Sequence, residues 1–229
     1  MDDALAAYQR GQFFVAAQAF TKLAEQGDAK AQLTLGDMYS KGKGVPQDKA
    51  AAARWYRKAA GKGNAEAQFS LGVMYENGDG VPQDKDEAAH WYREAAERGL
   101  AQAQTNLGVL CENGDGVPKD PTGAEYWYRK AATQGFAKAQ FNLGLMYFKG
   151  NGVSQDKAQA ARWYRRAAEQ GNAEAQFSLG LMYENGDGVR QNKAEAATWY
   201  RKAADQGFAK AQSNLRRLAG DQTLGVPKP

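Results

Sequence analysis

Residues 64–99, NAEAQFSLGVMYENGDGVPQDKDEAAHWYREAAERG, decide the fold, because the same pattern returns along the whole chain. Tryptophan occurs five times at intervals of 36, and a tyrosine follows each one; the tryptophans are Trp55, Trp91, Trp127, Trp163 and Trp199. A leucine and a glutamine, Leu71 and Gln68 in the quoted stretch, recur at the same interval. A period of this length held over a chain is typical of a solenoid, in which each unit packs on its neighbours.

Each repeat contains two apolar helical faces with a turn between them. Ala67, Leu71 and Met74 lie at i, i+4 and i+7, which predicts a first helix, called helix A. Ala88, Trp91 and the residues that follow keep the same spacing and predict a second helix, called helix B. The segment 76–83 between them has the composition of a turn. Neither helix can bury its apolar face alone, so the repeats must stack.

The predicted helix ends carry the residue types that such ends favour. An aspartate or asparagine precedes every helix B, as an N-cap whose side chain accepts from free backbone N–H groups: Asp48, Asp84, Asp120, Asp156 and Asn192. A glycine follows every helix B, where a left-handed C-terminal residue is common: Gly63, Gly99, Gly135, Gly171 and Gly207.

The pattern predicts an all-α fold, a right-handed α-solenoid of antiparallel helix pairs with a 36-residue repeat. We expect one solenoid over residues 1–229 with no domain boundary. Its predicted parts are an N-terminal capping helix pair over 1–27, five repeats over 28–207, a C-terminal capping helix over 208–219 and a tail over 220–229.

The repeated motifs resemble those of the Sel-1-like repeat family, which is related to the tetratricopeptide repeat. They are Ala-x-Ala-Gln-x-x-Leu-Gly-x-Met-Tyr, Gly-x-Gly-Val-Pro-x-Asp and Ala-x-x-Trp-Tyr-Arg-Lys-Ala-Ala-x-x-Gly, and the resemblance covers about residues 28–219. It implies an adaptor that holds other proteins, and some similar bacterial proteins look like periplasmic immunity proteins. A cysteine-rich branch of the family is reported to bind penicillin. That activity is not transferred, because these repeats carry no cysteine pairs.

No motif in the sequence predicts catalysis, a cofactor or a metal site. One cysteine and one histidine exclude the usual Cys/His zinc sites. Cys111 takes the place of a helix A tyrosine, so we expect a buried, inert thiol rather than a nucleophile served by His90. The glycine loop around Gly78 follows a helix rather than a strand, which disfavours a phosphate site. The recurring Glu76 and Asp79 could bind calcium, but solvated loop charge is the favoured interpretation.

The composition also limits the kinds of partner. A net charge of +4 is slight for 229 residues, which argues against a nucleic acid as the partner. We interpret the Trp-Tyr pairs as packing in the core rather than as a stacking surface for bases, because they follow the apolar stripe of helix B. No stretch is long and apolar enough for insertion into a membrane.

A candidate partner-binding groove follows from the face of helix A that the scaffold does not use. By resemblance to tetratricopeptide arrays, helix A lines the concave surface. The free positions lie two before, two after and five after the repeated leucine. The predicted groove residues are Phe69, Val73, Glu76, Val109, Glu112, Phe141, Leu145, Phe148, Phe177, Leu181 and Glu184. Two interpretations stay open: a groove that binds an apolar peptide or helix, or half-buried scaffold.

The leading functional hypothesis is a non-enzymatic, monomeric scaffold or adaptor that captures another protein or peptide on the concave helix A surface. A narrower alternative is a periplasmic immunity protein that neutralises a secreted toxin enzyme. A second alternative, disfavoured because no catalytic constellation converges, is an enzyme acting on the cell wall. Met1 to Ala4 resemble a mature exported start with an added methionine. We therefore expect a periplasmic or secreted bacterial protein whose signal peptide is absent from this chain, with the cytoplasm as the alternative.

Overall fold

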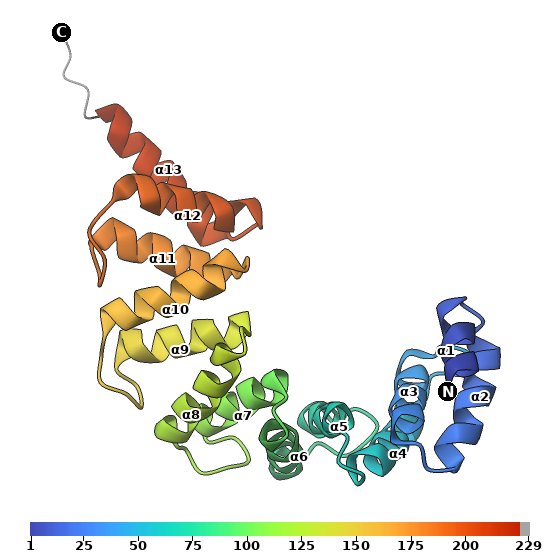
Figure 1. Ribbon diagram of the computed structural model, residues 1–229. Coiled ribbons are helices and arrows are strands. Elements are labelled where there is room, and N and C mark those ends of the chain that lie inside the picture. Colours follow the sequence, from blue (N-terminus) through green and yellow to red (C-terminus); the bar gives the residue numbers. More distant parts are fainter. Residues whose placement is uncertain (225–229) are drawn as a thin grey trace. The chain divides into compact units, whose positions relative to one another are not determined.

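The computed structural model describes the backbone of residues 1–224 and the side chains of residues 1–219, and this part of the chain forms thirteen α-helices and no strand (Figure 1). The helices are α1 (Asp2–Gln9), α2 (Phe13–Glu25), α3 (Ala29–Lys41), α4 (Lys49–Ala60), α5 (Ala65–Asn77), α6 (Lys85–Glu97), α7 (Ala101–Asn113), α8 (Pro121–Thr133), α9 (Ala137–Lys149), α10 (Lys157–Glu169), α11 (Ala173–Asn185), α12 (Lys193–Asp205) and α13 (Ala209–Leu224). Helix α13 thus runs beyond residue 219, and residues 225–229 of the predicted tail lie outside the described part.

The chain divides into two compact units, which we call the N-terminal unit (Met1–Asp120, α1 to α7) and the C-terminal unit (from Pro121, α8 to α13). Within each unit every helix packs on the helices before and after it, as Figure 1 shows. Helices α3, α5, α7, α9, α11 and α13 follow the helix A pattern, and α4, α6, α8, α10 and α12 follow the helix B pattern. The predicted fold class, an all-α solenoid of helix pairs with a 36-residue repeat, is confirmed.

A glycine of helix A and a tyrosine of helix B bring the two helices of a repeat together. The Tyr92 ring lies directly on Gly72, where a Cβ atom would be 2.7 Å from its Cδ1. Tyr92, Tyr128 and Tyr200 are fully buried. The tryptophans reach different depths: Trp163 and Trp199 are buried, whereas the other three are half-buried, and of these Trp55 and Trp91 pack against the core as expected. The tyrosine is the deeper member of each pair because it faces the side-chain-free glycine.

The repeated glutamine joins each helix B to the following helix A. The Nε2 of buried Gln68 donates to the carbonyl of Ala60 (3.2 Å), and Gln176 donates in the same way to Ala168 (3.0 Å). The last carbonyls of a helix have no partner within it. The glutamine side chain therefore satisfies a buried carbonyl at each junction between repeats.

The glycine loop rests on the repeat before it. Gly80 has φ +70°, and a Cβ atom there would lie 2.3 Å from the carbonyl carbon of Lys49, at the start of α4. A residue without a side chain is therefore needed both for the backbone conformation and for the close approach. The second glycine of the loop therefore packs against the preceding helix B. This agrees with a structural turn and not with a phosphate-binding loop.

The predicted helix ends are observed. The side chains of Asp48, Asp84, Asp156 and Asn192 accept hydrogen bonds from the first turn of helix B. The glycine after each helix B has a positive φ, between +78° at Gly63 and +93° at Gly99. Within the described part of the chain, no helix has the length and apolar character needed to cross a membrane.

Candidate partner-binding surface

All eleven predicted groove residues are half-buried and lie on helices of the A type. The structure places them in two sets. The N-terminal unit holds Phe69, Val73 and Glu76 on α5 and Val109 and Glu112 on α7; the C-terminal unit holds Phe141, Leu145 and Phe148 on α9 and Phe177, Leu181 and Glu184 on α11. Each set is discussed within its own unit.

The phenylalanines of these sets are partly scaffold. Phe69 and Phe141 each pack on the helix B tyrosine of their own repeat, with ring centroids 5.6 Å apart for Phe69 and Tyr92 and 5.6 Å apart for Phe141 and Tyr164. Phe177 packs in the same way and also contacts Phe208. One side of each ring therefore stabilises the helix pair, and the half-buried remainder is what a partner could contact.

Glutamates of the predicted groove accept hydrogen bonds from buried tyrosines. Glu76 accepts from the Tyr92 hydroxyl at 2.5 Å, and Glu184 accepts from the Tyr200 hydroxyl at 2.7 Å. Burial raises the pKa of both tyrosines, and the bond to the carboxylate raises it further. These glutamates therefore join helix A to helix B within a repeat, and they do not stand free at the rim of a groove.

The A-type faces of the two units contain small hollows at equivalent positions three repeats apart. The N-terminal hollow, of about 220 Å³, is lined by Ser40, Lys49, Tyr56, Phe69, Ser70, Val73, Met74 and Asp79. The C-terminal hollow, of about 200 Å³, is lined by Leu145, Phe148, Lys149, Tyr164, Ser178, Leu181, Met182, Asn185 and Asp187. Five of the eleven predicted groove residues, Phe69, Val73, Leu145, Phe148 and Leu181, line one or other of them.

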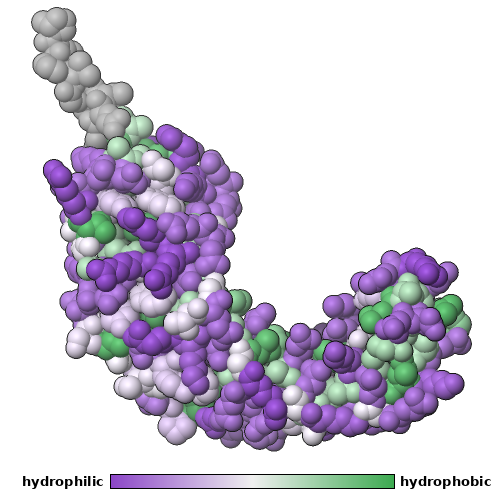
Figure 2. Space-filling view, in the orientation of Figure 1, coloured by the Kyte–Doolittle hydropathy of each residue, from purple (hydrophilic) through white to green (hydrophobic). Residues whose placement is uncertain are grey.

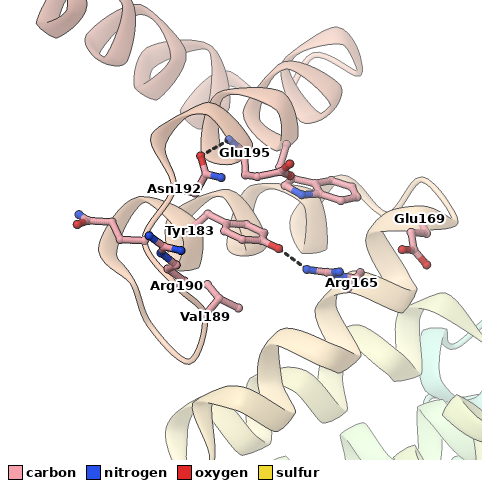
Figure 3. Close-up of a pocket in the computed structure, with 9 residues that line it drawn as sticks. Arg165, Glu169, Tyr183, Val189, Arg190, Asn192 and Glu195 are labelled. Carbon is pink, nitrogen blue, oxygen red and sulfur yellow. Dashed lines mark hydrogen bonds between the residues drawn. The ribbon is translucent and has the colours of Figure 1, made fainter.

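A larger, open hollow of about 660 Å³ lies elsewhere in the C-terminal unit and was not predicted (Figure 3). In it the Arg165 guanidinium donates to the Tyr183 hydroxyl, and Figure 3 shows this pair on one side and Arg190 on the other. The same arginine–tyrosine contact joins Arg57 to Tyr75 at 2.6 Å. It recurs with the repeat, so the repeat period was a signal that could have revealed the contact, though not the hollow.

The loop aspartates are paired rather than free. Asp79 binds Lys49, the first residue of the preceding helix B, at 2.6 Å, and Asp115 and Asp187 form the equivalent pairs with Lys85 and Lys157. The hydrogen bond from Lys85 lowers the pKa of Asp115. In the part of the chain with described side chains, no three His, Cys, Asp or Glu residues lie together in a way that could hold a metal ion.

Cys111 is buried on α7, as expected, and its burial raises the pKa of the thiol. A raised pKa leaves little of the reactive thiolate at neutral pH. His90 is exposed on α6 and contacts the edge of Trp91, with ring centroids 5.0 Å apart. The structure therefore offers no sign of an activated nucleophile at this cysteine.

Apolar surface also lies outside the predicted sets. Leu5, Phe14 and Val15 of α1 and α2 are exposed, Phe14 to 66%, and Figure 2 shows apolar residues at this end of the N-terminal unit. Tyr126 on α8 is exposed as well. These residues were not predicted, because the repeat pattern indicates only a cap for the first helix pair.

Comparison with known proteins identifies the repeat. The family model described as Sel1 repeat matches five consecutive segments: 29–64, 65–100, 101–136, 137–172 and 173–208. No curated protein sequence gives a significant match.

Two solved structures are similar in both sequence and fold. A Sel1 repeat protein from Oxalobacter formigenes is 35% identical with a TM-score of 0.88, over 99% of this chain and 90% of that one. A protective antigen present in uropathogenic Escherichia coli strains is 45% identical with a TM-score of 0.85. That match covers 87% of this chain but 43% of the other, so this chain spans less than half the length of that relative.

An immunity protein from Pseudomonas aeruginosa is similar in fold alone, at 24% identity and a TM-score of 0.52, over 80% of this chain and 67% of that one. The five matched repeats and the close match to the Oxalobacter structure agree with the motifs, the helix pairs and the 36-residue period. This chain belongs to the Sel1 repeat family.

Proposed function

We propose that this protein is a non-enzymatic scaffold that captures a partner protein on the faces of its A-type helices. Sel1 repeats serve as protein-interaction scaffolds and are generally not catalytic. The observation that carries the proposal is the pair of equivalent hollows on these faces, each lined by half-buried apolar side chains.

The energetic basis is the burial of apolar side chains that the fold leaves half-covered. Val73, Leu145 and Leu181 line the hollows without the ring contacts that tie the phenylalanines to the scaffold. Full burial of such a side chain is worth about 1.5–3 kcal/mol, and the larger part of that is already gained in the free protein, because each of these side chains is at most about a third exposed. A few such contacts do not by themselves exceed the costs of association, so the rest of the interface must also contribute to the affinity.

The test is affinity capture with a variant that changes this face and little else. Leu145→Lys with Leu181→Lys places two charges in the C-terminal hollow, and both side chains are long enough to reach solvent. The matched control is Tyr126→Lys, on the exposed side of α8 in the same unit. Bound proteins from the native organism would be quantified by mass spectrometry. We expect a partner that wild type and the control hold and the double variant loses. Retention by the double variant would refute the proposed surface.

The identity of the captured protein decides the narrower role. If the protein is a periplasmic immunity protein, we propose that its partner is a secreted toxin enzyme. Binding of this chain would then lower the activity of that enzyme. For the adaptor role, the activity of the partner is unchanged by binding. An enzyme assay of the purified partner with and without this chain separates the two. We further propose that the chain acts as a monomer, which light scattering over a concentration series would check.

A further inference from the structure

In several repeats the helix B tyrosine bonds to a carboxylate of its own helix A. The Tyr56 hydroxyl donates to Asp37 at 2.6 Å, and Tyr92 and Tyr200 donate to Glu76 and Glu184. The hydroxyl sits at the inner end of a buried ring, so the carboxylate supplies an acceptor where water is largely excluded.

The repeat built from α9 and α10 lacks this carboxylate. Phe148 occupies the place of Glu76 and Glu184, and α9 contains no aspartate or glutamate. Tyr164 is nevertheless as buried as its counterparts, with 2% of its surface exposed. Among the described residues, no hydrogen-bond partner is found for its hydroxyl. Burial alone raises the pKa of Tyr164, whereas a carboxylate contributes at Tyr56, Tyr92 and Tyr200.

Tyr164 lines the C-terminal hollow, so its donor is presented to whatever fills that space. The walls are apolar, from Leu145, Phe148, Leu181 and Met182. The volume of about 200 Å³ is below the range of about 300–1,000 Å³ that is usual for sites of small molecules. It suits one side chain of a longer ligand.

The charges around the hollow favour an anion. Asp187, the acidic lining residue, is neutralised by Lys157 at 2.6 Å, and the same ammonium lies 5.6 Å from the centre of the Phe148 ring. Lys149 is exposed at the rim. The two lysines and one aspartate leave one net positive charge beside the Tyr164 donor, which complements a carboxylate.

We propose that the C-terminal hollow binds a glutamate side chain of the partner polypeptide, whose carboxylate accepts a hydrogen bond from Tyr164 and whose methylene groups pack on Leu145, Phe148 and Leu181. The partner thus supplies the acceptor that Glu76 and Glu184 supply internally in other repeats. This inference rests on the proposed function and specifies which residue of the partner is recognised.

The test uses fluorescence polarisation of the intact chain with two pools of labelled, end-blocked heptapeptides. Both pools have the same randomised apolar and polar flanks, and the central residue is glutamate in one and glutamine in the other. We expect the glutamate pool to bind about tenfold more tightly, because a charge-assisted hydrogen bond is stronger than a neutral one. Tyr164→Phe should remove this preference.

A second variant occupies the Tyr164 donor with an acceptor from the protein itself. Phe148→Glu gives Tyr164 the internal acceptor that its counterparts have, so it should weaken binding of the glutamate pool about tenfold while the melting temperature stays the same or rises. The matched control is Ser40→Glu, at the equivalent position of the N-terminal hollow, where Tyr56 already has Asp37 as its acceptor. This control should bind the pool as wild type does.

Three results would overturn the inference: no binding of the glutamate pool, equal binding of both pools, or unchanged binding by a folded Phe148→Glu variant. Both pools could bind wild type equally and lose binding to the Leu145→Lys/Leu181→Lys variant. That result would support the A-type face as the binding surface and refute only the recognition of a glutamate carboxylate. Partner capture that survives in that double variant would instead overturn the proposed function itself.

Discussion

Replacing Arg98 by glutamine should stabilise the N-terminal unit. In the C-terminal unit, Gln170 donates to the Oε1 of Gln140 at 2.8 Å, and Gln206 donates to Gln176 in the same way. The residue at the same spacing from Gln68 is Arg98, and the Oε1 of Gln68 is buried with no hydrogen-bond partner.

The backbone is already suited to the change. Arg98 has φ −80° and ψ 2°, and Gln170 has φ −85° and ψ 4°, each as the residue that ends its helix B. The Nε2 of Gln68 keeps its bond to Ala60 in either case. A new hydrogen bond contributes about 1 kcal/mol net, and an unsatisfied buried acceptor costs about 1–3 kcal/mol. Arg98 is exposed, so its removal costs little. The expected gain is therefore about 1–2 kcal/mol.

Hydrogen exchange of the α5 and α6 amides is the suitable assay, because a repeat protein need not unfold in one step. The slowest amides should exchange about five- to thirtyfold more slowly in Arg98→Gln. A double-mutant cycle with Gln68→Ala isolates the pair, since the gain should vanish without the acceptor. An unchanged exchange rate, or the same gain in the Gln68→Ala background, would refute the reasoning. The reverse change, Gln170→Arg, should destabilise the C-terminal unit by a similar amount.

Three further outcomes follow from the packing and the shifted pKa values. Gly72→Ala should lower the free energy of unfolding by about 1–3 kcal/mol, because the new methyl group overlaps the Tyr92 ring; urea denaturation measures it, and an unchanged midpoint would contradict the close contact. Burial raises the folded pKa of Tyr164 above its unfolded value near 10, so its stabilising effect is complete below about pH 10 and is lost as the pH rises further. Urea midpoints should fall above about pH 10, and less steeply in Tyr164→Phe; equal slopes would exclude this cause. Cys111 should react with a thiol reagent much more slowly in the native protein than in urea, and equal rates would show that it is accessible.

The repeat and its helix ends could be predicted because they depend on local spacing and on residue type. The 36-residue interval, the N-cap at Asp84 and the glycine after each helix B are all visible in one copy of the unit and tested by the next. The relative depth of Trp91 and Tyr92 could not be predicted, because both residues lie on the same apolar stripe of helix B. Only the facing position of Gly72 shows which ring enters the core.

The candidate surface was predictable as a set of positions but not in its chemistry. The sequence places Glu76 and Phe148 at the same position of their repeats, and that comparison alone does not reveal what either one contacts. The structure adds that the hydroxyl of a buried tyrosine lies opposite, bonded at Tyr92 and without an acceptor at Tyr164. Hydrogen bonds between adjacent repeats, such as Gln170 to Gln140, depend on side-chain directions that a single repeat does not fix.

The contact between each glycine loop and the preceding helix B makes the length of the array adjustable. If residues 65–100 were deleted, Asp115 would take the place of Asp79 opposite Lys49, and Gly116 would take the place of Gly80 on the same backbone. The new junction would reproduce the old one, so whole units can be removed or copied by recombination without a new interface having to arise. A deletion whose length is not a multiple of 36 residues would separate the lysine from the aspartate that spans the new junction. The loop contact thus makes the 36-residue repeat the unit by which such a chain can be lengthened or shortened.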